Sequence, residues 1–235
     1  MDFIFMLTNH DATVPDAVDV YESISSTGLR LVGFKDVGAS ADTLRRLTDT
    51  MHEDARMVFL EVVSTSPEDE LRSIEAGLDL GVDVIMGGTN HEAALALLGE
   101  SGVRYFPFPG TVVGHPSELR GSIDAIAAQA AELTSQPAVG GLDLLAYRHR
   151  TVDPVDLTRE VVTASKGPVV VAGSIDRAER IQAVAGAGAW AFTIGGAIFD
   201  GLLPGAPDLG AQIEWTLQQC SDDVGTQGPD RRDPD

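Results

Sequence analysis

Eight short apolar runs, each followed by a segment of helical character, constrain the fold of this chain more than any other feature. The runs are apolar on successive residues, as in FIFML, MVFLEVV and PVVVA, and turn-forming residues bound them. Strands of a parallel sheet that is covered on both faces have this pattern. The repetition therefore predicts an α/β fold, a single-domain (β/α)8 barrel. The predicted strands cover residues 3–7, 29–35, 57–63, 82–86, 103–106, 140–146, 168–172 and 190–194.

The segments between the runs carry helix start and stop signals. Ser40 precedes one predicted helix, and Ser66 with Pro67 opens the next. The predicted helices cover residues 15–26, 42–53, 92–98, 116–134, 154–165, 177–185 and 208–219, together with the one that opens at residue 66. The barrel is thus expected to occupy residues 1–220. The acidic segment 221–235 has almost nothing to bury and is expected to be a disordered tail.

The charge balance excludes several classes of partner. Thirty-six acidic residues stand against sixteen basic ones, which gives a net charge of −20. Nucleic acid and anionic membrane surfaces would repel such a chain, so neither is an expected partner. An acidic surface of this kind is typical of salt-adapted proteins, because high ionic strength screens self-repulsion. We expect the protein to unfold at low salt; a free energy of unfolding that is indifferent to potassium chloride would contradict this.

The expected cellular compartment follows from the lack of a membrane span, a secretion signal and a disulfide in the sequence. It has no run of eighteen apolar residues and no basic segment ahead of an apolar one at its start, so neither a membrane span nor a secretion signal is predicted. Its single cysteine, Cys220, allows no internal disulfide. These features predict a cytoplasmic protein. A homodimer is the expectation for barrels in general.

The stretch from residue 169 to residue 199 suggests a phosphate site. Two predicted strands end in Gly173-Ser174 and in Gly195-Gly196, and each pair opens a helix. Backbone N–H groups at such places bind phosphate, and the loops after strands seven and eight are the usual phosphate site of a barrel. The alternative is that these glycines only form tight turns.

The motifs AGSIDRAERI and GAWAFTIGGAIF resemble the last quarter of the ribulose-phosphate-binding barrels. That superfamily includes histidine and tryptophan biosynthesis barrels, pentulose-phosphate epimerases and N-acylmannosamine-phosphate epimerases. The resemblance implies that Gly173, Ser174, Gly195 and Gly196 hold a phosphate. Over residues 2–200 the chain also resembles microbial barrels that carry the label 4-hydroxythreonine-4-phosphate dehydrogenase, from which we take the fold and the phosphate site.

Charged residues inside two neighbouring predicted strands suggest the chemistry. Lys35 ends the second strand, and Glu61 interrupts the apolar run of the third. Adjacent strands lie ~4.8 Å apart, so the two side chains meet if both point inward. Lys35 is then a phosphosugar ligand, an acid or an imine-forming amine, and Glu61 a base that takes a proton next to a carbonyl. The alternatives are a lysine that pairs with Asp36 at the rim, and a buried structural ion pair.

Further candidates come from the other strand ends. Asp143 either orients Lys35 or binds a sugar hydroxyl, unless it lies too deep in the barrel. Arg148 suits a phosphate or carboxylate, whereas His115 either covers the mouth or caps a helix. The predicted substrate-binding residues are Asn9, Asp36, Thr89, His115 and Arg148. No zinc site and no organic cofactor are predicted; a Mg²⁺ ion held by Asp36, Glu61 or Asp143 is left open.

These observations predict an enzyme that acts on a phosphorylated small molecule. The expected reaction is an isomerisation, an epimerisation or an aldolase-type cleavage, with Lys35, Glu61 and Asp143 as catalytic residues. Two alternatives of another class are a regulatory barrel that binds a phosphometabolite without turnover and a cofactor-dependent reductase.

Overall fold

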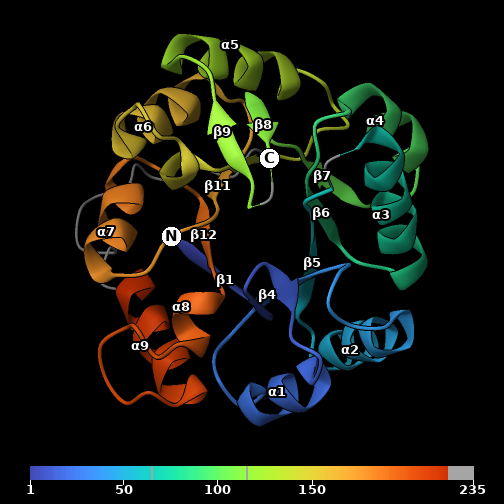
Figure 1. The fold of residues 1–235 in the computed structure, drawn as a ribbon, viewed down its shortest axis with the longest axis vertical. Helices are drawn as coiled ribbons and strands as arrows, with labels where there is room; N and C mark the ends of the chain where they lie inside the picture. The colour runs from blue at the N-terminus through green and yellow to red at the C-terminus, as the bar shows by residue number, and fades with distance from the viewer. Residues whose placement is uncertain (65, 115, 222–235) are drawn as a thin grey trace, which may run out of the picture.

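A parallel barrel forms the centre of the protein, seen here in a computed structural model that describes residues 1–64, 66–114 and 116–221. Figure 1 looks down the barrel, with helices forming a ring around the strands. Over the described residues the main sheet has eight parallel strands, in the order β10-β11-β12-β1-β4-β5-β6-β7. They are β1 (Asp2–Met6), β4 (Leu31–Lys35), β5 (Met57–Val62), β6 (Val84–Gly87), β7 (Arg104–Phe106), β10 (Leu142–Leu144), β11 (Val169–Val171) and β12 (Ala191–Ile194).

The two ends of this sheet meet and close the ring. The amide of Gly140 donates to the carbonyl oxygen of Tyr105 at 2.9 Å, and the amide of Asp143 donates to that of Pro107 at 3.0 Å. These bonds join β7 to β10. The predicted single-domain (β/α)8 barrel is therefore confirmed.

The helices follow the strands as predicted, and local signals fix their ends. Ser40 and Ser66 each accept a bond from a backbone amide in the first turn of their helices, and Gly81 ends α3 in the left-handed conformation. The helices are α1 (Ala17–Ile24), α2 (Ala41–Glu53), α3 (Pro67–Leu80), α4 (His91–Leu98), α5 (Ile123–Leu133), α6 (Pro154–Ala164), α7 (Ala178–Gly186), α8 (Gly196–Phe199) and α9 (Leu209–Ser221), with a 3-10 turn η1 (Ala146–Arg148).

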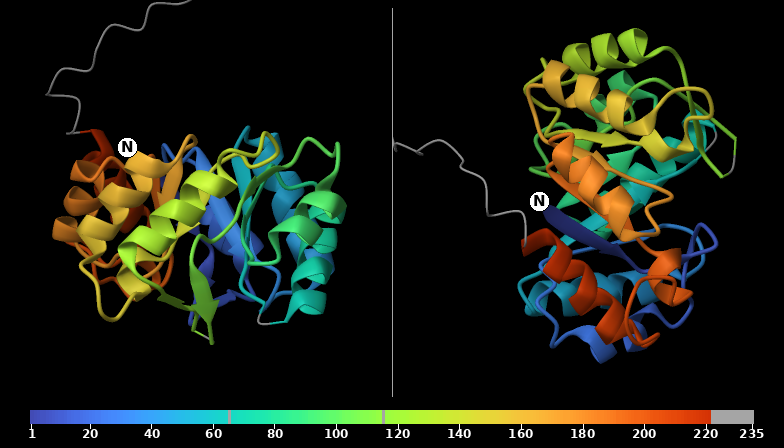
Figure 2. Two further views of the ribbon diagram at one scale, coloured as in Figure 1. Left: turned by 90° about the horizontal axis from the view of Figure 1, so that it is seen from above. Right: turned by 90° about the vertical axis from the view of Figure 1, so that its left-hand side faces the viewer.

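One predicted element is wrong. The helix predicted over residues 116–134 begins only at Ile123, with Ser122 as its N-cap. Ahead of it lies a hairpin, β8 (Thr111–Val113) with β9 (Glu118–Arg120), which projects from the barrel rim opposite the N-terminus in Figure 2. Residues 118–120 are extended because they pair with residues 111–113 across a short turn, and the helix signals of the segment do not report this pairing. A second small hairpin, β2 (Thr8–Asn9) with β3 (Ala12–Thr13), follows β1.

The barrel interior is apolar except near the carboxyl ends of its strands. Alternate residues of the strands fill it, including Ile4, Met6, Leu31, Phe59, Val84, Met86, Phe106, Val170 and Ala191. Because side chains on a strand alternate between faces, Lys35, Glu61 and Thr193 continue these inward rows toward the carboxyl ends. Asp143 joins them because it lies in register with inward-facing Val170. Polar side chains thus cluster above the apolar interior, at the carboxyl ends of the strands, where barrel enzymes have their active sites.

The predicted tail and one predicted site residue fall largely outside the residues that the structure describes. Residues 222–235, most of the predicted tail, and His115 lie beyond the described ranges. Within those ranges, no helix is both long and apolar enough to cross a lipid bilayer.

Candidate functional site

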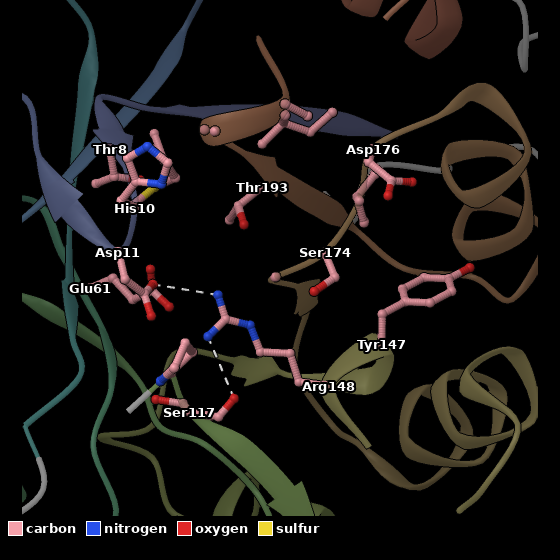
Figure 3. A pocket seen from close by; sticks show the side chains of 18 of the residues that line it. Thr8, His10, Asp11, Glu61, Ser117, Tyr147, Arg148, Ser174, Asp176 and Thr193 are labelled. Atoms are coloured by element: carbon pink, nitrogen blue, oxygen red, sulfur yellow. Dashed lines mark hydrogen bonds and ion pairs between the residues drawn. The ribbon is translucent and has the colours of Figure 1, made fainter. Parts of the chain in front are cut away.

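A pocket of about 920 Å³ opens at the carboxyl ends of the strands (Figure 3). Its size suits a small metabolite. Residues from opposite sides of the barrel line it: the β2–β3 turn, β4 and β5 on one side, and the turns after β11 and β12 on the other. Those used below are Thr8, Asp11, Lys35, Glu61, Arg148, Gly173, Ser174, Asp176, Gly195 and Gly196.

Lys35 lies between two carboxylates. Its Nζ is 2.5 Å from Asp11 Oδ1 and 3.6 Å from Glu61 Oε2, and its side chain is only 3% exposed. The backbone of Lys35 is fixed by Thr13, whose hydroxyl accepts from the Lys35 amide at 2.8 Å and donates to its carbonyl at 2.7 Å. The ammonium group of Lys35 therefore has a carboxylate on each side.

Asp11 is the residue of this cluster that the sequence did not single out. It is the second residue of the two-residue turn between β2 and β3, where His10 and Asp11 have φ of 48° and 64°. Such turns favour Asn and Gly, so a His-Asp pair in the left-handed region stores strain, as residues at functional sites often do. Burial would raise the pKa of Asp11, but Lys35 and Arg148 outweigh burial and the pKa is lowered.

Arg148 links the charged cluster to the glycine turns. Its Nη2 is 3.4 Å from Asp11 Oδ1, and its Nη1 donates to the Ser117 carbonyl at 3.5 Å. In Figure 3 the guanidinium lies between Asp11 and Glu61 on one side and Ser174 on the other. A Cβ atom added to Gly173 would collide with Arg148 Nε, so the absence of a side chain at position 173 lets this arginine lie across the turn.

Backbone amides of both glycine turns are open. Within the described part of the chain, the amides of residues 173–176 and 195–197 donate to no protein acceptor. These seven residues line the same pocket. Gly173 and Ser174 both lie in the left-handed region, with φ of 77° and 59°. A serine in the left-handed region is again a strained residue at the site.

Gly195 is required by a close approach. A Cβ atom at this position would lie 2.6 Å from the Thr8 carbonyl oxygen and 2.7 Å from the Thr8 hydroxyl. The glycine therefore lets the turn after β12 pack directly on the residue that follows β1. This packing brings the second glycine turn into the pocket.

Comparisons with known proteins support the fold but assign no activity. No family model matches the chain, and no curated protein matches it. Among solved structures, one described as native KDPGal has a TM-score of 0.69 at 12% identity, over 96% of this chain and 97% of that one. The N-acetylmannosamine-6-phosphate 2-epimerase from Clostridium perfringens gives 0.59 at 12% identity, over 95% and 93%. The YdjI aldolase from Escherichia coli K12 gives 0.58 at 13% identity, over 85% and 77%. The chain is similar to these barrels in fold.

Three further predicted residues, Asn9, Asp36 and Thr89, are not among those that line this pocket. Asn9 Nδ2 donates to Asp200 Oδ1 at 3.3 Å. Asp36 accepts a bond from the Ser73 hydroxyl, and Lys35 pairs with Asp11 rather than with Asp36. Thr89 lines a separate cavity of about 220 Å³. Across residues 1–64, 66–114 and 116–221, no group of three His, Cys, Asp or Glu side chains is arranged to hold a metal ion.

Asp143 lies beneath the pocket rather than in its wall. It has no exposed surface, and neither carboxyl oxygen has a hydrogen-bond partner in the described structure. Burial, followed by the nearby negative charge of Glu61, raises the pKa of Asp143 well above its usual value. This depth agrees with the alternative that Asp143 lies too deep in the barrel to bind a sugar hydroxyl.

A last group of side chains supports the first glycine turn from outside. Arg180 donates to the Ser174 carbonyl and lies 4.8 Å from the ring centre of Tyr147, a cation–π contact. Asp176 forms ion pairs with Arg180 at 3.2 Å and Arg177 at 3.5 Å, which balance its charge at the pocket wall. Asp176, Arg177 and Arg180 are close in sequence, and the fold brings Tyr147 to them.

Proposed function

We propose that this protein is an enzyme that moves a proton next to the carbonyl group of a small phosphorylated sugar or sugar acid. The reaction class is an isomerisation, an epimerisation or an aldolase-type cleavage. The observation that carries the proposal is one pocket that holds an ammonium between carboxylates on one side and open backbone amides on the other.

The open amides supply the phosphate end of this proposal. The turns at Gly173-Ser174 and Gly195-Gly196 offer N–H donors without acceptors, which suits the oxygens of a phosphate dianion. Arg148 adds a fixed positive charge beside Gly173. An anion bound here lies across the pocket from Lys35 and Glu61, so a short sugar chain would span the two sides.

The charged cluster supplies the reacting end. Glu61 takes the proton from the carbon next to the carbonyl, and the electron pair of that C–H bond moves toward the carbonyl oxygen. Lys35, as an ammonium, stabilises the negative charge that develops on this oxygen and gives it a proton. Asp11 holds Lys35 in place. An imine-forming lysine needs a neutral amine, which neighbouring cations or an apolar site favour, so two flanking carboxylates support the electrophile role instead.

The fold neighbours support the general kind of substrate. One is named for a phosphorylated aminosugar, N-acetylmannosamine-6-phosphate, on which it acts as an epimerase, and another is named an aldolase. An epimerase of a phosphorylated aminosugar and an aldolase therefore both occur on barrels of this shape. Identities near 12% support the fold alone.

Solvent deuterium uptake tests the proposal before the product is known. The protein is incubated in D₂O at high salt with a panel of phosphorylated ketoses, aldoses and sugar acids, and exchange at carbon is followed by proton NMR. We expect uptake at the position next to the carbonyl for at least one compound, and none for its unphosphorylated form. Tight binding of a compound without exchange would contradict the enzyme and favour a regulatory barrel.

A further inference from the structure

Asp143 is the most isolated polar group of the barrel interior. It is fully buried, and both of its carboxyl oxygens lack a partner among the described residues. Glu70, another buried carboxyl, differs in this respect: its oxygens accept the amides of Thr89 at 2.9 Å and Asn90 at 2.8 Å. An ionised carboxylate without hydrogen bonds is very costly in a dry interior, whereas one with two N–H donors is not.

The charged cluster beside Asp143 does not balance if every carboxyl is ionised. Glu61 on β5, Lys35 on β4 and Arg148 in η1 act on Asp143, and Asp11 in the β2–β3 turn pairs with both of these cations. Together with Asp143 the cluster has three carboxyls against two cations. An ionised Asp143 would carry the excess negative charge at the one position of the cluster that has no exposed surface. A single bound proton restores the balance.

The geometry selects which carboxyl holds that proton. Asp11 Oδ1 contacts both Lys35 and Arg148, and Glu61 Oε2 lies 3.6 Å from Lys35 with 9% of its side chain exposed. Both carboxylates therefore have a cation within reach, and both line the pocket. Asp143 has neither a paired cation nor contact with the pocket. The proton is therefore placed on Asp143, the carboxyl group of the three that has no cation paired with it.

We propose that Asp143 is a neutral carboxylic acid in the resting protein, and that it acts as a positioning residue by keeping the pocket charge at two cations and two carboxylates. Burial and the charge of Glu61 both raise the pKa of Asp143, while Lys35 and Arg148 oppose them more weakly. A neutral Asp143 leaves Lys35 and Arg148 to pair with the two carboxylates that line the pocket. The positioning role of Asp143 rests on the proposed function, because Glu61 is the base of that reaction.

The pH dependence of stability is the first test. A carboxyl whose pKa is raised on folding binds a proton in the folded state that the unfolded chain has lost. Its contribution to stability is therefore full below the unfolded pKa near 4 and falls as pH rises toward the folded pKa. Asp143→Asn keeps the shape but cannot lose a proton. We expect the folding equilibrium constant of the variant, relative to wild type, to rise by up to about tenfold per pH unit in that window.

Infrared spectroscopy gives a second readout that a merely structural role would not move. The difference spectrum of wild type minus Asp143→Asn at neutral pH should contain the carbonyl stretch of a protonated carboxyl, shifted in D₂O. Glu70→Gln is the matched control, because it removes a buried carboxylate that accepts two amides; its difference spectrum should contain only carboxylate bands.

Two results would overturn the proposal: a stability ratio that does not change with pH, or a difference spectrum with carboxylate bands alone for Asp143→Asn. If that variant does not fold, wild-type protein with ¹³C-labelled aspartate decides by NMR, through the presence or absence of one protonated carboxyl resonance at neutral pH. None of these measurements uses a substrate, so their outcome is separate from that of the proposed reaction.

Discussion

Glu61→Gln is expected to lower the rate of solvent deuterium uptake by ~10²–10⁴-fold, the usual contribution of a positioned base. Glutamine keeps the size of the side chain and can occupy the same place beside Lys35, but it cannot accept the proton from carbon. The main ion pair of the cluster, between Lys35 and Asp11 at 2.5 Å, does not involve Glu61 and should persist. The loss should therefore appear in turnover and not in substrate affinity.

The control for this variant is Glu92→Gln. Glu92 is an exposed glutamate in α4 that does not line the pocket. The substitution removes the same charge from the protein and should leave deuterium uptake unchanged. Uptake at the wild-type rate in Glu61→Gln would exclude Glu61 as the base. Reduced uptake in both variants would point to overall charge instead of to the site.

Lys35→Met is expected to lower the free energy of unfolding by ~3–5 kcal/mol, the usual cost of removing one partner from a buried ion pair. Methionine fills most of the space but leaves Asp11 and Glu61 without the ammonium that compensates them. Denaturant unfolding at high salt measures the change. The variant should also show no deuterium uptake, because nothing then stabilises the developing oxyanion.

The chain carries its own control for this substitution. Lys166 is the other lysine of the sequence, and it is exposed ahead of β11. Lys166→Met should change stability by no more than ~0.5 kcal/mol, as surface substitutions usually do. Equal effects of the two substitutions would show that Lys35 is not held in a buried charge cluster. A second change, Asp11→Asn in the Lys35→Met background, should recover part of the lost stability.

The fold could be predicted because strand and helix signals in this chain are local. Runs such as PVVVA and caps such as Ser66 with Pro67 act within a few residues, and the structure confirms the elements they predict. The proximity of Lys35 and Glu61 followed from the spacing of adjacent strands, and the structure places their charged atoms 3.6 Å apart. Such inferences need only the order of neighbouring strands.

What could not be predicted depends on contacts between distant segments. Asp11 reaches Lys35 because the β2–β3 turn folds back over the rim, and nothing local identifies that direction. The same holds for Arg148, which lies across Gly173. The β8–β9 hairpin differs, because its strands pair across a short turn and the same segment carries helix signals. Loops vary more than the elements that they connect, whereas the barrel beneath them is common to many proteins.

A crystal structure with inorganic phosphate tests the central claim most directly, namely that the two glycine turns form an anion site facing Lys35 and Glu61. The claim predicts phosphate bound in the pocket, with its oxygens within hydrogen-bond distance of the amides near Ser174 and Gly196 and close to Arg148. Phosphate bound elsewhere, or a pocket without phosphate in crystals that contain it at saturating concentration, would contradict the claim.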